Sequence, residues 1–304
     1  MTPYYAVNAF ETFALQVQLG AEIDQRTKTG HWLALIDTAF DHGKKIPPWP
    51  TTVWPIYHRG KLALMKSVSP VLLALPSADD AGFEKIISRL LNHCRGRPML
   101  SFLHSNKPPQ ALCESWQSVL EIETESGQPF VLRFADTRTT PAIAAVLSSD
   151  VWARLSHGIE DWLCIDREGG LQELPLTDPQ GQEPLAGETQ EIVRISNHAL
   201  AQLLRLGQPD ALADALQEHF PELLVPQQGA SMHRRLSATC ELAEKNGIEA
   251  FPDLMALAVG IYSTDGQLLE DPDFKNWLQQ RQWESEGLAY ALSEYLEPSK
   301  ASES

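Results

Sequence analysis

Three charged residues near the middle of the chain have types and spacing that could do chemistry. Arg133, Asp136 and Arg138 follow one another within six positions, at the end of the apolar stretch 130–135. A carboxylate between two guanidinium groups could act in catalysis, or it could form ion pairs that anchor a loop. A buried charge without a partner is costly, so we predict the second role. Asp136 should pair with at least one of the arginines, or with nearby backbone, and hold the strand end against the next helix.

Histidines and cysteines offer two weaker candidates for chemistry. Four of them fall in one region of the sequence: His93, Cys94, His104 and Cys113. Their spacing lacks the paired CxxC or HxxxH ligands of a zinc site. The stretch 157–162 places His157 near two carboxylates, which would need a cleft and a shifted pKa to act as acid and base. Since the sequence also contains no P-loop, GxSxG, HExxH or GxGxxG motif, we expect no catalytic residues, no bound metal and no cofactor.

Aromatic residues spaced by prolines form another candidate for recognition. Trp49, Trp54 and Tyr57 could make an exposed patch that contacts a partner. Alternatively, these rings cover a sheet edge or pack beneath a loop. Both interpretations remain open at the level of sequence.

The composition indicates a globular protein with a strong imbalance of charge. The chain has 304 residues, 43% hydrophobic and 21% charged, which favours about two domains with a real core. The formal net charge of −16 argues against a nucleic-acid partner. Residues 1–170 carry 18 acidic and 16 basic side chains, whereas residues 171–304 carry 22 acidic and 8 basic ones.

The acidic half of the chain has two interpretations. It is a solvated coat that keeps the protein soluble, or a docking face that steers a basic partner. Candidate partner-binding carboxylates fall in three clusters: Glu218 and Glu222; Glu241 and Glu244; Glu270, Asp271 and Asp273.

Cysteine usage and apolar runs indicate the compartment. The four cysteines form no CxxC pair, as is typical of reduced cytosolic thiols. The N-terminal residues lack a basic start and a long apolar run, and the longest apolar runs are too short to span a bilayer. We therefore expect a cytoplasmic protein without a membrane segment.

Residues 1–176 alternate between strand-like and helix-like segments. Apolar runs or alternation predict strands, and a hairpin turn is expected at 125–128. The first predicted strand begins at His31. The others span residues 54–58, 69–76, 98–105, 119–124, 130–135, 161–166 and 171–176. Helical spacing predicts helices over 78–94, up to Trp116 and over 140–147, the last with Pro141 in its first turn. These elements predict a mixed-sheet α/β (α+β) domain.

The rest of the chain has a different pattern. Residues 177–190 are polar and contain prolines and glycines, which indicates a linker. Residues 191–298 show short helical segments with no competing strand signal, and therefore predict an all-α lobe of five or six helices. Residues 299–304 should form a disordered tail.

Several segments between residues 32 and 174 resemble the type VI secretion effector adaptors, also called effector chaperones, whose domain was first catalogued as one of unknown function. The segments occur in the family's order: ALIDTAF (34–40), WPIYHRG (54–60), SPVLLALP (69–76), FVLRFADTR (130–138) and HGIEDWLCID (157–166). The residues that carry the resemblance are Asp37, Arg133, Asp136, Arg138 and Trp162.

The resemblance implies a non-enzymatic domain that binds a secreted effector and helps to load it onto the spike, the VgrG trimer with or without its PAAR tip. It implies no cofactor and no contact with nucleic acid or membrane. Two alternatives remain: an immunity-type inhibitor whose acidic lobe neutralises a toxin, and an enzyme that uses the Arg–Asp–Arg or His157 region. An adaptor should bind its effector away from the toxic domain, whereas an inhibitor should bind the toxic domain itself.

Overall fold

The structure is a computed structural model that divides into two compact units. It describes residues 5–26, 29–43, 48–49, 51–77, 79–147, 149–177, 193–224 and 229–297. We call Asn8–Leu206 the sheet unit, and Gly207–Ser304 together with Met1–Val7 the helical unit. The predicted tail and all of the predicted linker except Thr177 lie outside the described residues.

The sheet unit is built on a six-stranded sheet with the order β2-β3-β1-β4-β7-β8, in which every neighbouring pair is antiparallel. Its strands are β1 (His31–Ile36), β2 (Val53–Pro55), β3 (Val71–Ala74), β4 (Leu100–Ser105), β7 (Ile159–Ile165) and β8 (Leu171–Glu173). The central strands β1 and β4 are buried along most of their length. Burial on both faces explains why they read in the sequence as apolar runs without polar alternation.

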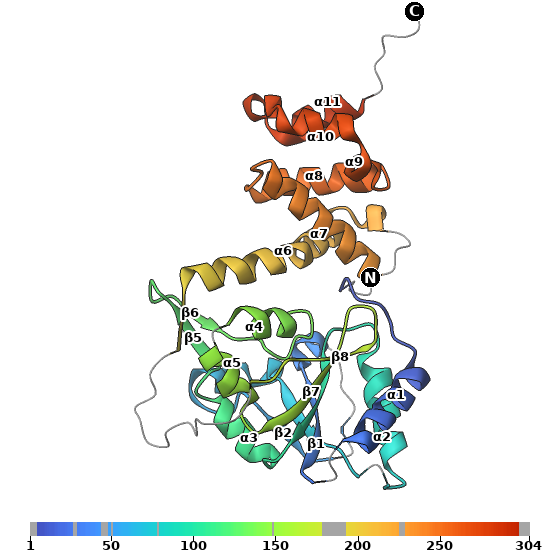
Figure 1. Cartoon of the computed structure of the whole chain (residues 1–304), viewed down its shortest axis with the longest axis vertical. Coiled ribbons are helices and arrows are strands. Elements are labelled where there is room, and N and C mark those ends of the chain that lie inside the picture. The colour runs from blue at the N-terminus through green and yellow to red at the C-terminus, as the bar shows by residue number, and fades with distance from the viewer. Residues whose placement is uncertain are drawn as a thin grey trace, which may run out of the picture. The chain divides into compact units, whose positions relative to one another are not determined.

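Helices cover both faces of this sheet (Figure 1). On one side lie α1 (Thr12–Gln25) and α2 (Phe83–Cys94); on the other lie α3 (Pro109–Trp116), α4 (Thr140–Val146) and α5 (Ser149–Ser156). The predicted helix over 78–94 begins only at Phe83, and Pro141 occupies the first turn of α4 as predicted. The sheet unit therefore has three layers, and the predicted combination of a sheet with helices is confirmed.

An aromatic cluster fills the core between the sheet and α3, α4 and α5. Trp116 lies 4.9 Å from Phe134, and Trp152 stacks 5.4 Å from Trp162 between ring centroids. Trp162, one of the residues that carries the resemblance, is completely buried in β7. Since removing a large aromatic side chain from a core costs about 3–5 kcal/mol, this tryptophan supports the fold.

A smaller sheet contains one strand that the sequence did not predict. The hairpin strands β5 (Glu121–Thr124) and β6 (Pro129–Val131) are antiparallel, and β9 (Val193–Ile195) pairs parallel to β5. The predicted return strand 130–135 ends early, at Val131. β9 has only three residues, and so short a segment does not show whether its hydrophobic pattern has the period of a strand or of the helix that follows.

The helical unit contains the second half of α6 (Asn197–His219) and the helices that follow it. These are α7 (Gly229–Lys245), α8 (Phe251–Ser263), α9 (Gln267–Glu270), α10 (Pro272–Gln279) and α11 (Leu288–Leu296). Short 3-10 turns are η1 (Thr38–Asp41) and η2 (Gly60–Val68) in the sheet unit and η3 (Pro221–Leu224) and η4 (Gln282–Ser285) in the helical unit. The boundary between the units falls inside α6, at Leu206 and Gly207, next to the helix-interior Pro209. No helix in the described part of the chain combines the length and apolar character needed to cross a bilayer.

Candidate functional site: the arginine cluster and the His104 pocket

Asp136 and Arg138 form a tightly bonded ion pair. The Arg138 side chain donates to both carboxylate oxygens of Asp136, with Nε 3.1 Å from Oδ1 and Nη2 2.8 Å from Oδ2. The backbone N–H of Arg138 also donates to Oδ1, at 3.0 Å. Both side chains are largely buried, so the pairing predicted from their spacing is confirmed.

The backbone of Asp136 ties the same loop to the start of α4. Its carbonyl oxygen accepts from the N–H of Thr139 at 2.9 Å and from the N–H of Thr140 at 3.0 Å. The Thr140 hydroxyl donates to this carbonyl and to that of Phe134. The residues between β6 and α4 are therefore cross-linked by side-chain and backbone bonds, as expected for an anchored loop.

Arg133 pairs with a carboxylate far away in the sequence. Its Nη2 lies 2.8 Å from Oδ2 of Asp37, the residue that caps η1 at the end of β1. Burial raises the pKa of Asp37 above its usual range, and the nearby Arg133 offsets only part of this effect. The Arg133 side chain remains 50% exposed, so part of it is accessible at the surface.

Phe40 connects these two ion pairs. The guanidinium carbon of Arg133 lies 5.8 Å from the centre of the Phe40 ring, and that of Arg138 lies 5.4 Å from it. Such cation–π contacts add to the electrostatic stabilisation of both arginines. We call Asp37, Phe40, Arg133, Asp136 and Arg138 the arginine cluster. Both of its carboxylates already bind arginine, whereas Arg133 can still bind an outside carboxylate or carbonyl.

Another buried carboxylate, Asp41, is the last residue of η1, whereas Asp37 caps its N-terminal end. Asp41 bonds to Arg97, and His93 Nε2 lies 2.9 Å from its Oδ2. Although burial alone would raise it, the pKa of Asp41 is lowered, because His93 and Arg97 stabilise the charged form. Asp41 thus differs from Asp37, which has a single half-exposed cation as its partner.

The three aromatic residues proposed as a recognition patch lie in different environments. Trp49 packs edge-on against His93, 5.1 Å between centroids, with Arg89 over its face. Trp54 is half-buried in β2 and packs against the core, and Tyr57 is only 3% exposed. Tyr57 therefore contributes no exposed ring, and the packing interpretation holds for it.

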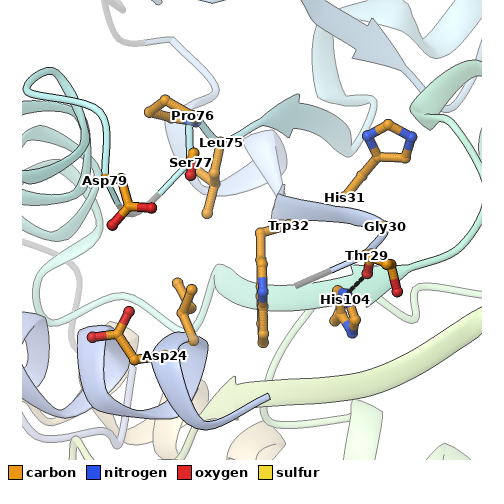
Figure 2. A pocket seen from close by; sticks show the side chains of 11 residues that line it. Asp24, Thr29, Gly30, His31, Trp32, Leu75, Pro76, Ser77, Asp79 and His104 are labelled. Carbon is orange, nitrogen blue, oxygen red and sulfur yellow. Dashed lines mark hydrogen bonds between the residues drawn. The ribbon is translucent and has the colours of Figure 1, made fainter. Parts of the chain in front are cut away.

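At the opposite end of β1, the sheet unit contains a pocket of about 550 Å³ (Figure 2). Trp32 and His104 form its inner side, and Asp24 and Asp79 lie toward α1 and α2. The Trp32 ring stacks on the His104 ring at 5.1 Å. The pocket thus combines an aromatic ring, a buried histidine and carboxylates, which are residue types that occur in catalytic sites.

Both ring nitrogens of His104 already face hydrogen-bond acceptors. Nδ1 lies 3.1 Å from a carboxylate oxygen of Asp161 and of Glu160, and Nε2 lies 2.7 Å from the carbonyl oxygen of Thr29. Asp161 in turn bonds to Arg26. Groups of the protein itself contact both nitrogens, so neither is open to a substrate in this arrangement. His104 therefore braces β4 against β7 and the loop before β1.

Gly30 allows this close packing around His104. Its φ of +102° favours glycine, and a Cβ atom there would lie 2.8 Å from the Ser105 carbonyl oxygen and 2.9 Å from His104 Nε2. Sequence reasoning placed Glu160 and Asp161 next to His157, whereas the structure shows their contact with His104. A partner 57 positions away from Asp161 leaves no signal in a single sequence.

The acidic candidates are spread over several elements of the helical unit. Glu218 lies at the end of α6 and Glu222 in η3, while Glu241 and Glu244 are exposed on α7. Glu270 ends α9, and Asp271 caps α10 by accepting from the N–H of Asp273. Asp271 thus has a structural role in addition to its charge.

The cysteines are free, and Cys94, Cys113 and Cys164 are buried. Burial raises the pKa of both Cys113 and Cys164 to about 12, so both remain thiols at neutral pH. Across the described ranges, no three His, Cys, Asp or Glu side chains form a group that could hold a metal ion.

Comparison with known proteins gives one match. Residues 34–154 match the model of a family described as "Domain of unknown function (DUF4123)". This segment runs from β1 into α5 and contains the whole arginine cluster, whereas Trp162 lies beyond its end. No curated protein and no solved structure matches the chain.

Proposed function

We propose that this protein is a non-enzymatic adaptor, or effector chaperone, that binds a type VI secretion effector and helps to load it onto the VgrG/PAAR spike. One observation carries the proposal. The segment that matches the DUF4123 model contains most of the segments that resemble the effector adaptors, and its charged motif residues gather in one cluster. The function itself comes from the resemblance, because the matched family's description names none.

The geometry of the arginine cluster supports a binding role. Asp37 and Asp136 are buried and paired, so they are better placed to hold a surface in shape than to exchange protons with a substrate. Arg133 is the exposed member, and arginine is well suited to interfaces because its planar group binds carboxylates and carbonyls in a fixed geometry. A stable complex would bury at least about 1,000 Å² in total. No cofactor, nucleic acid or membrane is required, and the loading step would take place in the cytoplasm.

Co-purification tests this proposal directly. The tagged full-length chain is co-expressed with the products of its neighbouring genes, and complexes are isolated by affinity and size-exclusion chromatography. An adaptor retains an effector whose toxic domain has been deleted, and it also recovers the spike protein. An effector bound only through its toxic domain, together with rescue of cells from toxicity, would support the immunity-type inhibitor instead.

A variant pair tests the role of the exposed arginine. Arg133→Gln should weaken recovery of the effector or spike, because it removes the charge that faces solvent. Arg59→Gln is the matched control, since Arg59 is an exposed arginine of the same unit and is also paired to a carboxylate, Glu114. Equal recovery with both variants would exclude Arg133 from the interface.

A further inference from the structure

The helical unit contains an apolar groove formed mainly by α8 and α11. Its volume is about 360 Å³, and apart from two serines every side chain that lines it is apolar. On α8 the lining positions 252, 255, 256, 259 and 263 recur at helical spacing, and on α11 positions 289, 292, 293 and 296 do the same. Each helix therefore presents one continuous face to the groove.

Small residues allow the groove to form. Gly260 permits close packing of the two helices, since a Cβ atom there would lie 2.6 Å from Leu292 Cδ2. The side chains of Ala256, Ala289 and Ser293 are short and therefore leave space in the groove. Met255 adds a flexible side chain that can adapt to partners of different shape.

Exposed aromatic residues lie on the two helices that form the groove. Phe251, at the start of α8, is 44% exposed, and Tyr290, in the first turn of α11, is 55% exposed. The Tyr290 hydroxyl donates to the Glu294 carboxylate at 2.8 Å, so the polar end of this side chain is bonded on the same helix. A combination of an apolar groove and nearby aromatic side chains is characteristic of surfaces that bind other proteins.

The charges on these segments have one sign. Residues 246–264, which include α8, contain Glu249 and Asp253 but no lysine or arginine. Residues 285–297, which include α11, are also without basic residues and contain three glutamates: Glu286, Glu294 and Glu297. Glu284, just before them, pairs with Arg281 at 2.9 Å. A partner that places basic side chains beside the groove would therefore meet complementary charge.

We propose that this groove docks a helix-forming segment of another protein that has one apolar face flanked by lysine or arginine. A helix fits better than an extended peptide, because the apolar lining offers almost no partners for an exposed backbone, whereas a helix bonds its own N–H and C=O groups. The 13 residues of α8 extend over about 20 Å, enough for roughly three to four turns of a partner helix.

A designed peptide provides the probe. A fluorescent peptide of about 18 residues, roughly 27 Å long as a helix, carries leucine along one face and lysine elsewhere. Binding to the full-length chain is measured by fluorescence anisotropy at low salt. The same composition in shuffled order should bind at least tenfold more weakly, and a leucine–glutamate version should not bind. Equal binding of all three peptides would overturn the proposal.

Matched variants locate the bound peptide. Ala289→Trp places a bulky ring in the groove at an exposed position and should weaken binding at least tenfold, whereas Gln279→Trp, at an exposed position on α10, should not. Thermal unfolding checks that both variants fold. The double change Phe251→Ser and Tyr290→Ser removes exposed apolar surface without touching the core, and it should also weaken binding. Wild-type affinity in the tryptophan and serine variants would contradict docking in the groove.

Charge reversal tests the electrostatic part. Glu294→Lys with Glu297→Lys should weaken binding several-fold at low salt and less at high salt, because exposed charges are screened over about 10 Å at 0.1 M. Glu84→Lys, at an exposed position on α2 of the sheet unit, is the control and should have little effect. Sedimentation of the free chain tests whether a second copy of this protein occupies the groove instead. If the protein dimerises and Ala289→Trp abolishes the dimer, a second copy occupies the groove and the proposal fails.

Discussion

The two units use charge differently. In the sheet unit, Asp37, Asp41 and Asp136 are buried and each contacts an arginine. In the helical unit, Glu218, Glu222, Glu241, Glu244 and Glu270 are exposed. Buried ion pairs are costly to break, whereas exposed carboxylates have small effects on stability and act mainly on association. The difference indicates that buried carboxylates maintain the fold in the sheet unit, whereas these exposed carboxylates of the helical unit contribute little to stability.

The largest expected effect comes from removing a buried carboxylate. Asp136→Ala should lower the free energy of unfolding by about 3 kcal/mol or more, because it leaves the largely buried Arg138 without its partner. Urea unfolding followed by circular dichroism measures the change, and Glu241→Ala is the control, expected within about 0.5 kcal/mol of wild type. A stable Asp136→Ala protein that no longer binds its partner would place the motif in an interface instead.

Glycine substitutions should have opposite signs in the two units. Gly30→Ala should destabilise the protein by about 1–3 kcal/mol, because φ is +102° and a Cβ atom would clash with the Ser105 carbonyl. Gly207→Ala lies inside α6 with no atom within 4 Å of the added Cβ, and it should stabilise the protein by about 0.5–1 kcal/mol. Thermal unfolding compares the two. If both variants shifted the unfolding temperature in the same direction, local backbone geometry would not explain their effects on stability.

The acid dependence of stability should separate the two carboxylates at the ends of η1. The pKa of Asp41 is lowered in the folded state, so its contribution is present above the unfolded pKa of about 4 and is lost as pH falls through the folded pKa. The pKa of Asp37 is raised, so its dependence has the opposite sign: its protonation near and above pH 4 favours the folded state. Asp41→Asn should therefore flatten the loss of stability below about pH 4, measured by urea unfolding between pH 2 and 7. Asp37→Asn should instead steepen the loss of stability as pH falls toward about 4, because the variant lacks the stabilising protonation of Asp37 in that range. Identical profiles for the two variants would refute these assignments.

The smallest effect on stability is expected from exposed acidic clusters. Reversing Glu218 and Glu222 to lysine should change the free energy of unfolding by less than about 1 kcal/mol. The same variant should slow association with a basic partner at low salt, with an effect that fades as salt increases. Stopped-flow measurements can compare this pair with reversals at Glu241 and Glu244, or at Glu270, Asp271 and Asp273. Wild-type association rates for all three clusters at low salt would identify the charge as a solubility coat.

The sequence by itself determined features that depend on near neighbours. The apolar runs of β1, β4 and β7 identified buried strands, and the helical spacing of α2 identified its buried face, because hydrophobic periodicity is a local property. A pairing of Asp136 with at least one of the nearby arginines was also predicted, and the structure shows that Arg138 is the partner. The two residues are two positions apart and had to share one loop.

The tertiary structure decided which distant residues meet. Arg133 bonds to Asp37, 96 positions away, and His104 bonds to Asp161, 57 positions away. The pairing of β9 with β5 and the groove between α8 and α11 likewise join segments separated in the chain. Such contacts depend on strand order, register and helix packing. Strand order, register and helix packing are determined by the free energy of the whole fold. No local pattern in a single sequence therefore reveals which distant residues will meet.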